Sequence, residues 1–517
     1  MDTFSDTIDE MEKQDKNITV EKETKVFGFK SDNVRHQVMG YFVMNCLRTD
    51  EDYESYIKLS SVDSLLEYVR NWRYSKGENK RCLYLPEKME DALIKRLGLA
   101  AIIHVMMDEG DYDNDNCNEE RRRKVISNVK VPRELFDWDY DARSRYVECA
   151  RKGTQIIHRA RAMIVGCAGA GKTTLLKRLQ RKKLEEITDV KSTVGLEVHE
   201  DIFEVSQDQD SLRALTDESN KEGKTLLSVL DFGGQCAYYA CHQVYLSRRA
   251  FYILVIDMSK SFKDKVDKAL CDQEGTMFGD WTYGEYLLFW MKSIHFYCAK
   301  DVPVILVGTH LDRSEHQTSD EFYRRILDHL RHDENLKVHL NRKRCFIIGF
   351  RENDEQCLDQ FLDLEKCIVS IAKEDRWKET IPRDWAICEV ILRKLKSTER
   401  MLSRKAVSSE FLYYIQEKST NVQDVLKLFH DIGIILHFDE QCLSETIVID
   451  IQWFVDAFKN IITDPNHALD LVRDHEEWMN FYQNGYLSNL LLQKIWKSRR
   501  LDNSTQKSIL QYMQRLD

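Results

Sequence analysis

From residue 162 onward, short apolar runs rich in β-branched residues alternate with longer segments of helical periodicity. The runs with the strand pattern are 162–165, 195–205, 226–230, 251–256, 302–307 and 345–348. The helical segments between them are 173–184, a stretch near 238–247, 283–297, 320–331 and 358–373. Strands separated by helices predict an α/β domain with a mostly parallel sheet and helices on both faces. A polar stretch at 206–224 joins the second and third runs, which are therefore expected to form an antiparallel excursion.

The N-terminal part of the chain has a different pattern. Residues 1–28 are rich in Asp, Glu, Lys, Ser and Thr and lack apolar periodicity, which predicts a flexible acidic tail. Between 29 and 152 the spacing becomes helical, with helices expected near 65–72 and 86–105 and an acidic loop at 108–118. The pattern therefore indicates a helical N-terminal region, and it assigns no role to that region.

After residue 376 the pattern predicts a smaller α+β unit at 377–517. The expected elements are helices at 384–395, 408–417, 422–429 and 453–462 and strands at 433–438 and 446–450. The last four elements, in the order helix, strand, strand, helix, resemble a winged-helix unit. The 422–429 helix contains Asp424 and Lys427 but no arginine, so docking onto protein is favoured over DNA binding.

Composition restricts the class of protein further. The chain has 517 residues, 43% hydrophobic residues and a formal net charge of −11. The acidic balance argues against binding to nucleic acid, and no apolar run reaches the roughly 18 residues that a membrane-spanning helix needs. The 14 cysteines include no Cys-x-x-Cys pair, as expected for free, buried thiols. We therefore expect a soluble, cytoplasmic protein with no nucleic-acid partner and no transmembrane segment.

The strongest chemical signal lies where the 162–165 strand ends. The residues from Gly166 to Thr173 match the phosphate-loop pattern GxxxxGK[ST] and open the next helix. Glycines let backbone N–H groups surround phosphate oxygens, Lys172 adds a positive charge between the β- and γ-phosphates, and Thr173 offers a hydroxyl to Mg²⁺. The predicted nucleotide-binding residues of this loop are Gly166, Cys167, Ala168, Gly169, Ala170, Gly171, Lys172, Thr173 and Thr174.

The base is expected to be recognised after the 302–307 strand, where the sequence is Thr309-His310-Leu311-Asp312. In GTPases an aspartate at this place accepts hydrogen bonds from the N1–H and N2–H groups of guanine, a donor pair that adenine lacks. Asp312 would make this contact, Thr309 would brace the turn and His310 would cover the base. The pattern therefore favours GTP, and an ATP-dependent switch is the weaker alternative.

Two segments between these motifs supply the candidate catalytic groups. The third strand leads into Asp231-Phe-Gly-Gly234-Gln235. Here Asp231 would hold Mg²⁺ through a water, the Gly234 N–H would contact the γ-phosphate and Gln235 would orient the attacking water. Upstream, Thr193 is expected to complete the Mg²⁺ shell, with Ser192 as the alternative. The predicted catalytic residues are Gln235, Lys172 and Thr193, and the predicted metal ligands are Thr173, Thr193 and Asp231.

The tripeptide Asp231-Phe-Gly also matches a protein-kinase motif. The other kinase motifs do not precede it in the required order, so kinase activity is not expected from this chain.

Together these motifs resemble the Roc–COR tandem of Roco proteins. The resembling segments are 153–166, the Gly-Lys-Thr-Thr at 171–174, 231–235, the Thr-His-Leu-Asp at 309–312 and 428–438. The resemblance implies a Ras-like P-loop GTPase domain, Roc, at 153–376, followed by a COR module at 377–517 that is truncated after its first half. It implies a switch in intracellular signalling, and it does not extend to the N-terminal third of the chain. From the site residues we expect slow hydrolysis of GTP to GDP with Mg²⁺. Protein partners are expected to bind the COR module and the N-terminal helices. The family dimerises through the second half of COR, so a dimer is possible but is not assumed.

Two sequence features leave the rate of hydrolysis open. Gly349 and Phe350 stand where the family has a Ser-Ala-like pair in the last guanine loop, and no residue is an obvious arginine finger. The chain is therefore either a slow GTPase or a scaffold that binds guanine nucleotide and hardly hydrolyses it. The altered loop favours the scaffold, whereas Gln235 favours the enzyme.

Overall fold

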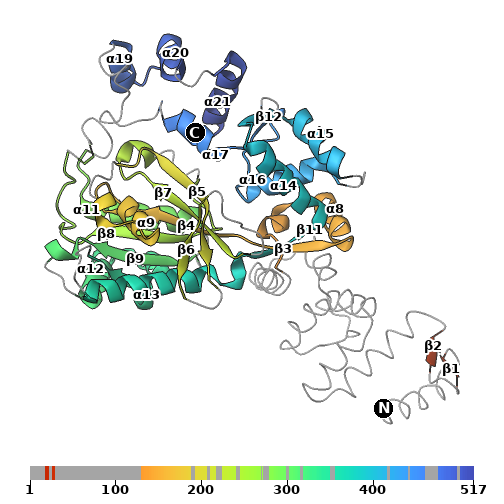
Figure 1. The fold of residues 1–517 in the computed structure, drawn as a ribbon, viewed down its shortest axis with the longest axis horizontal. Helices are drawn as coiled ribbons and strands as arrows, with labels where there is room; N and C mark the ends of the chain where they lie inside the picture. Colours follow the sequence, from red (N-terminus) through yellow and green to blue (C-terminus); the bar gives the residue numbers. More distant parts are fainter. Residues whose placement is uncertain are drawn as a thin grey trace, which may run out of the picture. The chain divides into compact units, whose positions relative to one another are not determined.

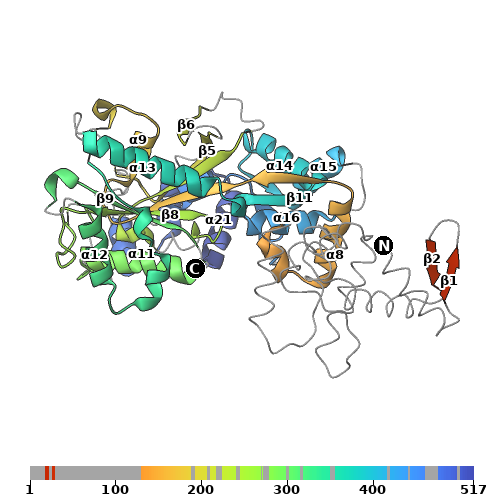
Figure 2. The ribbon, with the colours of Figure 1, turned by 90° about the horizontal axis from the view of Figure 1, so that it is seen from below.

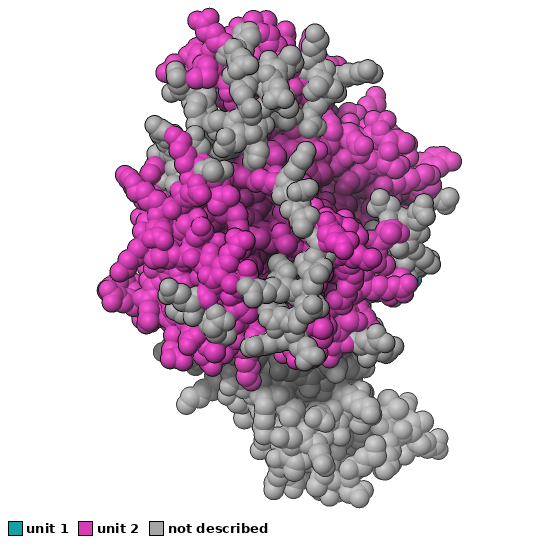
Figure 3. All heavy atoms as spheres, turned by 60° about the vertical axis from the view of Figure 1, so that its left-hand side comes forward, with its two compact units in different colours: residues 1–156, 379–387, 417–424 teal, residues 157–378, 388–416, 425–517 magenta. Residues whose placement is uncertain are grey.

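The protein consists of two compact units. The computed structural model describes residues 18–21, 26–29 and 130–516, except 188–191, 207–209, 217–223, 240–244, 269, 272–278, 299–301, 315–317, 350–354, 416–419, 441–442, 460, 462–475 and 498–500. The first unit comprises 1–156, 379–387 and 417–424, and the second, magenta in Figure 3, comprises 157–378, 388–416 and 425–517. The helices predicted near 65–72 and 86–105 and the acidic loop at 108–118 lie outside the described residues.

A seven-stranded sheet forms the centre of the second unit, in the order β10-β9-β8-β4-β7-β5-β6 (Figure 1). Its strands are β4 (Ala160–Val165), β5 (Leu196–Val205), β6 (Leu212–Ala214), β7 (Leu226–Phe232), β8 (Phe251–Asp257), β9 (Val304–Thr309) and β10 (Cys345–Ile347). Neighbouring strands from β10 to β7 are parallel, whereas β5 runs antiparallel to both β7 and β6. The predicted mostly parallel sheet with one antiparallel excursion is confirmed.

Helices cover both faces of this sheet. The covering helices are α9 (Lys172–Leu179), α11 (Tyr283–Tyr297), α12 (Ser319–His329) and α13 (Glu355–Ala372). Successive strand residues point to opposite faces, so Ile164 packs with α9 and α13, whereas Met163 packs with α11 and α12. Figure 2 shows the two helix pairs on opposite sides of the strands. The carboxyl ends of β4, β8 and β9 therefore meet at one edge of a sheet that is buried on both faces.

Local signals explain where two of these helices begin and end. Helix α11 has the bounds predicted, because Thr282 and Glu285 form a capping box: the Thr282 hydroxyl accepts from the Glu285 N–H at 3.3 Å and Glu285 accepts from the Thr282 N–H at 2.6 Å. Helix α9 was predicted to run to residue 184 but ends at Leu179. Arg181 adopts a positive φ of 64°, which an α-helix cannot continue through.

The helix predicted near 238–247 stays a prediction: Tyr239, directly after η5 (Cys236–Tyr238), is helical, and 240–244 lie outside the described residues. Two other predictions about the shorter elements were wrong. The polar 206–224 stretch contains strand β6, whose short length hides the alternation of a strand. The supposed tail includes an antiparallel pair, β1 (Ile18–Glu21) and β2 (Val26–Phe29). Composition averaged over the whole tail had hidden the alternation of Ile18 and Val20 with polar residues.

The C-terminal module has the element order of a winged helix. Its elements are α14 (Arg383–Lys396), β12 (Met401–Ser403), α15 (Arg404–Tyr414), α16 (Val422–Asp431), β13 (Thr446–Val448) and α17 (Ile451–Lys459). Strand β12, which was not predicted, pairs with β13, and the strand predicted at 433–438 is reduced to a single bridge between Leu436 and Val448. Among the described residues after α17 lie the helices α19 (Glu476–Asn484), α20 (Asn489–Lys497) and α21 (Asn503–Leu516). They share a core with α17 that includes Trp496 and Tyr512.

The first unit has a small aromatic core. Its described elements include η3 (Arg133–Asp137), α8 (Tyr140–Arg151), β3 (Thr154–His158) and β11 (Lys378–Pro382), and β3 pairs with β11. The Tyr146 and Trp385 rings meet edge to face with centroids 5.3 Å apart. Further 3-10 helices in the chain are η4 (Leu184–Glu186), η7 (Leu311–Arg313), η8 (Glu334–His339), η9 (Arg342–Arg344) and η10 (Asp375–Trp377). No helix within the described ranges is long and apolar enough to cross a membrane.

Candidate nucleotide-binding site

The phosphate-loop residues form a tight turn between β4 and α9. Gly166, Gly169 and Gly171 have φ angles of 143°, 73° and 86°, which L-residues rarely adopt. A Cβ atom on Gly166 would lie 2.2 Å from the Val255 carbonyl oxygen, so only glycine lets the chain leave β4 directly against β8. The turn ends at the N-terminus of α9, where backbone N–H groups have no partner within the helix and can bind an anion.

The remaining loop residues lie in the same turn. Cys167, Ala168 and Ala170 are buried, and Thr174 is partly buried in the first turn of α9. One neighbour was not predicted from the sequence. A Cβ on Gly169 would lie 2.8 Å from Leu270 Cδ1, so the Leu270 side chain covers this bend.

Lys172 lies inside the loop rather than in solvent. Its ammonium donates hydrogen bonds to the carbonyl oxygens of Gly166 at 3.0 Å and Cys167 at 2.8 Å. Burial lowers the pKa of Lys172, and the carboxylate of Asp231 opposes that shift. Two neutral carbonyl oxygens stabilise the positive charge of Lys172 only in part. The site therefore favours the binding of an anion next to the ammonium.

Three oxygen atoms converge beside Lys172, from Thr173, Thr193 and Asp231. The Thr173 hydroxyl lies 2.6 Å from both the Thr193 hydroxyl and Asp231 Oδ2, and the Thr193 hydroxyl lies 3.0 Å from the same carboxylate oxygen. The two threonine hydroxyls supply only two protons for these three oxygen–oxygen contacts. While Asp231 is ionised, one of the three contacts therefore has no proton between its oxygens. Ser192, the alternative to Thr193, is exposed, whereas Thr193 is buried within this cluster.

These oxygens fit a magnesium ion. Mg²⁺ prefers hard oxygen ligands and in nucleotide sites takes few protein ligands besides phosphate oxygens. The second carboxylate oxygen of Asp231 is buried and makes no hydrogen bond within the described structure. Burial raises the pKa of Asp231, while hydrogen bonding from Thr173 and the charge of Lys172 lower it. A cation at this position would compensate the carboxylate and the crowded hydroxyl oxygens together.

Thr309 joins the predicted base loop to the phosphate loop. Its hydroxyl donates to the Ala170 carbonyl oxygen at 2.8 Å and also lies 3.2 Å from the Ile256 carbonyl oxygen. A Cβ on Gly171 would lie 3.7 Å from Thr309 Cγ2 and 3.9 Å from His310 Cε1. The two motifs, about 140 residues apart in the chain, therefore lie side by side at one edge of the sheet.

The two other predicted site residues of the base loop are His310 and Asp312. His310 adopts the left-handed conformation, with φ 56°, and begins η7. Its Nδ1 atom lies 3.1 Å from the Thr309 hydroxyl and 3.5 Å from Asp257 Oδ1. The Asp312 side chain is 30% exposed, with Arg313 Nε at 3.7 Å from one carboxylate oxygen. Asp257 was not singled out from the sequence, although its place at the end of a parallel strand is a signal for a site residue.

Gln235 and Gly234 lie against the other parts of the site. Gln235 is 3% exposed, and its side-chain amide donates to the Ser192 hydroxyl, while its carbonyl oxygen makes no hydrogen bond to any described group. A Cβ on Gly234 would lie 2.4 Å from the backbone nitrogen of Ala168, so this glycine rests directly on the phosphate loop. The structure thus brings together the predicted catalytic residues, but Gln235 faces the Thr193 segment. Phe350 of the last guanine loop lies outside the described residues.

Gln452 of α17 contacts the same region from the C-terminal module. Its side-chain oxygen accepts from the Val198 N–H at 2.6 Å, and its nitrogen donates to the Leu196 carbonyl at 3.3 Å and to Asp456 at 2.8 Å. A Cβ on Gly195 would lie 3.1 Å from Lys459 Cβ. Helix α17 is therefore bound to β5 directly after Thr193, which sequence reasoning had not revealed.

Comparison with protein families agrees with this geometry. Residues 161–312 match the family model "Ras of Complex, Roc, domain of DAPkinase", and residues 382–517 match "C-terminal of Roc, COR-A domain". The two matches are consecutive and together cover more than half of the chain.

The chain belongs to the Roco family. It carries a Ras-like Roc domain followed by a COR-A domain.

Individual proteins are similar to the chain over most of its length. The probable serine/threonine-protein kinase pats1 of Dictyostelium discoideum is 25% identical over 372 residues, which are 68% of this chain and 10% of pats1. The Roc-COR-CHAT protease of Runella zeae is 26% identical over 361 residues, 65% of this chain and 33% of the protease. The chain thus spans about a tenth of pats1 and a third of the protease. The solved structure of Methanosarcina barkeri Roco2 RocCORdC bound to GDP aligns with a TM-score of 0.44 and 19% identity, covering 70% of this chain and 92% of that one.

Proposed function

We propose that the chain is a guanine-nucleotide switch that binds GTP with Mg²⁺ and hydrolyses it slowly to GDP. The observation that carries this proposal is the Thr309–Ala170 hydrogen bond of 2.8 Å, which fixes the base loop beside the phosphate loop so that one nucleotide can reach both. The test is to identify the nucleotide that copurifies with the protein and to measure competition between GTP and ATP. Guanine nucleotide and preference for GTP are expected; adenine nucleotide would support the alternative switch that uses ATP.

Binding and hydrolysis would divide among the residues of the site as follows. Backbone N–H groups of the phosphate loop and the ammonium of Lys172 would hold the phosphates, and Asp312 would accept from guanine. Thr173, Thr193 and Asp231 would hold Mg²⁺, which supplies positive charge to the phosphate oxygens when it is bound. Gly234 would donate its N–H to the terminal phosphate.

Gln235 would orient the attacking water. Its amide carries both a donor and an acceptor, as this role requires, but in the structure the donor is engaged by Ser192. Because that hydrogen bond must break before Gln235 can bind water near the phosphate, turnover would be slow.

Replacing Gln235 with leucine distinguishes the slow GTPase from the scaffold that binds nucleotide but hardly hydrolyses it. We expect Gln235→Leu to lower single-turnover phosphate release by about 10- to 100-fold, because water is no longer oriented, while GTP affinity changes by less than about threefold. Ser192→Ala is the matched control: it frees the Gln235 amide and should leave release equal or faster. Equal background rates in wild type and Gln235→Leu would instead support the nucleotide-bound scaffold.

Helix α17 would couple the nucleotide state to the COR-A domain. Thr193 belongs to the oxygen cluster, and Gln452 binds the backbone of β5 three to five residues later. In addition, Val455 of α17 packs in the core beneath α11 and α12. A change in the position of Thr193 on loss of the terminal phosphate would therefore reach α17 through β5.

Gln452→Leu tests this coupling. The variant keeps the size of the side chain but leaves the Val198 N–H without its acceptor, so Thr193 should be held less well. We expect GDP to dissociate about 3- to 10-fold faster, measured by displacement of a fluorescent nucleotide. Gln506→Leu removes a comparable hydrogen bond, 2.9 Å to the Leu501 carbonyl in α21, and should leave dissociation unchanged. Equal effects of both substitutions would show general destabilisation and contradict the coupling.

The predicted division of the chain fits this function. We propose that 153–376 form the Roc domain and 377–517 the COR module, and that COR and the N-terminal helices bind protein partners in a signalling pathway of the cytoplasm. The cysteines that the structure describes are free thiols, which is compatible with a reducing compartment.

A further inference from the structure

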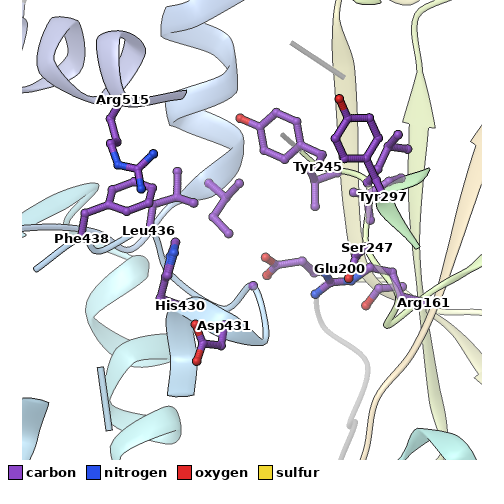
Figure 4. Close-up of a pocket in the computed structure, with 16 residues that line it drawn as sticks. Arg161, Glu200, Tyr245, Ser247, Tyr297, His430, Asp431, Leu436, Phe438 and Arg515 are labelled. Atoms are coloured by element: carbon purple, nitrogen blue, oxygen red, sulfur yellow. The ribbon is translucent and has the colours of Figure 1, made fainter. Parts of the chain in front are cut away.

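A cavity of about 700 Å³ lies between the Roc sheet and the COR-A domain, away from the phosphate loop. Figure 4 shows its two walls: Arg161, Glu200, Tyr245 and Tyr297 on the Roc side, and COR-A residues, including Phe438, on the other. A second cavity of about 360 Å³ adjoins it. The residues that line both are Arg161, Glu200, Ser228 and Gly433.

Arg161 is the unusual residue of this wall. It lies on β4, in the middle of the sheet, and its side chain is partly buried. A Cβ on Gly433 would lie 3.2 Å from its Nη1 atom, so the guanidinium reaches the COR-A wall. Nevertheless it makes no hydrogen bond and no ion pair with any residue that the structure describes. A guanidinium has five N–H donors, and those of Arg161 face cavity space in which solvent or a ligand can accept their hydrogen bonds.

Two charged groups near Arg161 have ion-pair partners of their own. Arg159 donates to both carboxylate oxygens of Glu389, one of them at 2.8 Å. Glu200, the acidic group of the shared wall, binds Lys396 at 2.7 Å. Burial lowers the pKa of Arg161; the charge of Glu200 opposes this shift, and the charges of Arg249 and Arg159 add to it. The cavity wall can therefore bind one more negatively charged group next to Arg161.

The rest of the large cavity combines polar groups, among them His430, Asp431 and Arg515, with a continuous apolar and aromatic part. Leu230, Leu246, Leu436 and Ile451 line it together with the rings of Tyr245, Tyr297 and Phe438. Its volume lies in the range of pockets that hold small organic ligands, which combine an apolar body with a few polar contacts. An inorganic ion alone would leave most of this surface uncovered.

We propose that this cavity binds a small organic anion whose carboxylate or phosphate group pairs with Arg161 and whose apolar or aromatic body packs between the tyrosines and Leu436. Arginine binds both oxyanions with two parallel hydrogen bonds. Such a ligand would contact Roc and COR-A at once and hold them together. The proposal uses none of the phosphate-loop residues, so its failure and that of the proposed GTPase function are distinguishable.

Titration calorimetry on the full chain with model ligands tests the site. The probes are phenyl phosphate, phenylacetate, inorganic phosphate and benzyl alcohol. We expect saturable binding of at least one aryl anion, at least 10-fold weaker binding of inorganic phosphate and of the alcohol, and a matching rise in melting temperature. Absence of saturable binding by either aryl anion would overturn the proposal, and so would equal binding of inorganic phosphate or benzyl alcohol.

Substitutions locate the binding. Arg161→Met should weaken aryl-anion binding at least 10-fold while GDP binding is retained, which shows that the variant folds. Arg331→Gln, at an exposed arginine just after α12 that lines neither cavity, is the matched control and should bind as wild type does. Leu436→Trp, which fills the apolar wall and retains Arg161, should also block binding if Arg161→Met fails to fold. Unchanged affinity in Arg161→Met or in Leu436→Trp would assign the binding elsewhere.

Discussion

Lys172→Met is expected to reduce GTP affinity by at least about 100-fold while leaving the nucleotide-free protein as stable as wild type or more so. The loss follows because charge-assisted hydrogen bonds are each worth about 1.5–3 kcal/mol, and the ammonium lies where the β- and γ-phosphates would bind. The stability result follows from burial, which lowers the pKa of Lys172 and so disfavours its charge in the empty site. Affinity is measured with a fluorescent guanine nucleotide, and stability by thermal melting without nucleotide.

The matched control for this substitution is Lys177→Met, one and a half turns further along α9. Lys177 is partly buried on the same helix but lies beyond the phosphate loop, so nucleotide affinity should stay within about threefold of wild type. If Lys172→Met binds GTP as tightly as wild type does, the phosphate loop is not part of the nucleotide site. A parallel fall in affinity in both variants would point to charge in general rather than to this ammonium.

Asp312→Asn is expected to weaken GTP binding by about 1000-fold. Asparagine replaces one acceptor oxygen with an NH₂ donor, which would face a donor of guanine, and an unmatched polar group of this kind costs on the order of several kcal/mol. The side chain is 30% exposed and asparagine has nearly the same size and shape, so the melting temperature of the free protein should change little.

Xanthosine triphosphate provides the decisive comparison for Asp312→Asn. Xanthine keeps the N1–H donor of guanine but carries a carbonyl oxygen in place of the 2-amino group, so it matches the donor and acceptor of an asparagine amide. The variant should therefore prefer xanthosine triphosphate to GTP, and its affinity for ATP should remain low. Wild-type base preference in the variant would mean that Asp312 does not contact the base.

Much of the fold and of the candidate site could be predicted from local sequence patterns. The alternation of apolar runs and helical segments predicted the sheet and its antiparallel excursion, because β4, β8 and β9 are largely buried on both faces and are therefore mostly apolar. The turn formed by the glycines of the phosphate loop could also be predicted, because their backbone angles depend on only a few neighbouring residues. Elements with weak local signals were missed, as β12 shows: its three residues become a strand only by pairing with β13.

By itself, the sequence determined which residues can bind phosphate, metal and base, because each motif is a short run whose chemistry belongs to its own side chains and backbone. Only the tertiary structure decided which of them meet. It placed Thr309 on Ala170, buried Thr193 rather than Ser192 beside Asp231, turned Gln235 toward Ser192 and set Gln452 on β5. It also left Arg161 facing a cavity, with no hydrogen-bond or ion-pair partner among the residues that the structure describes. These contacts join residues tens to hundreds of positions apart, and their energies depend on distance and burial, which no local pattern of residues encodes.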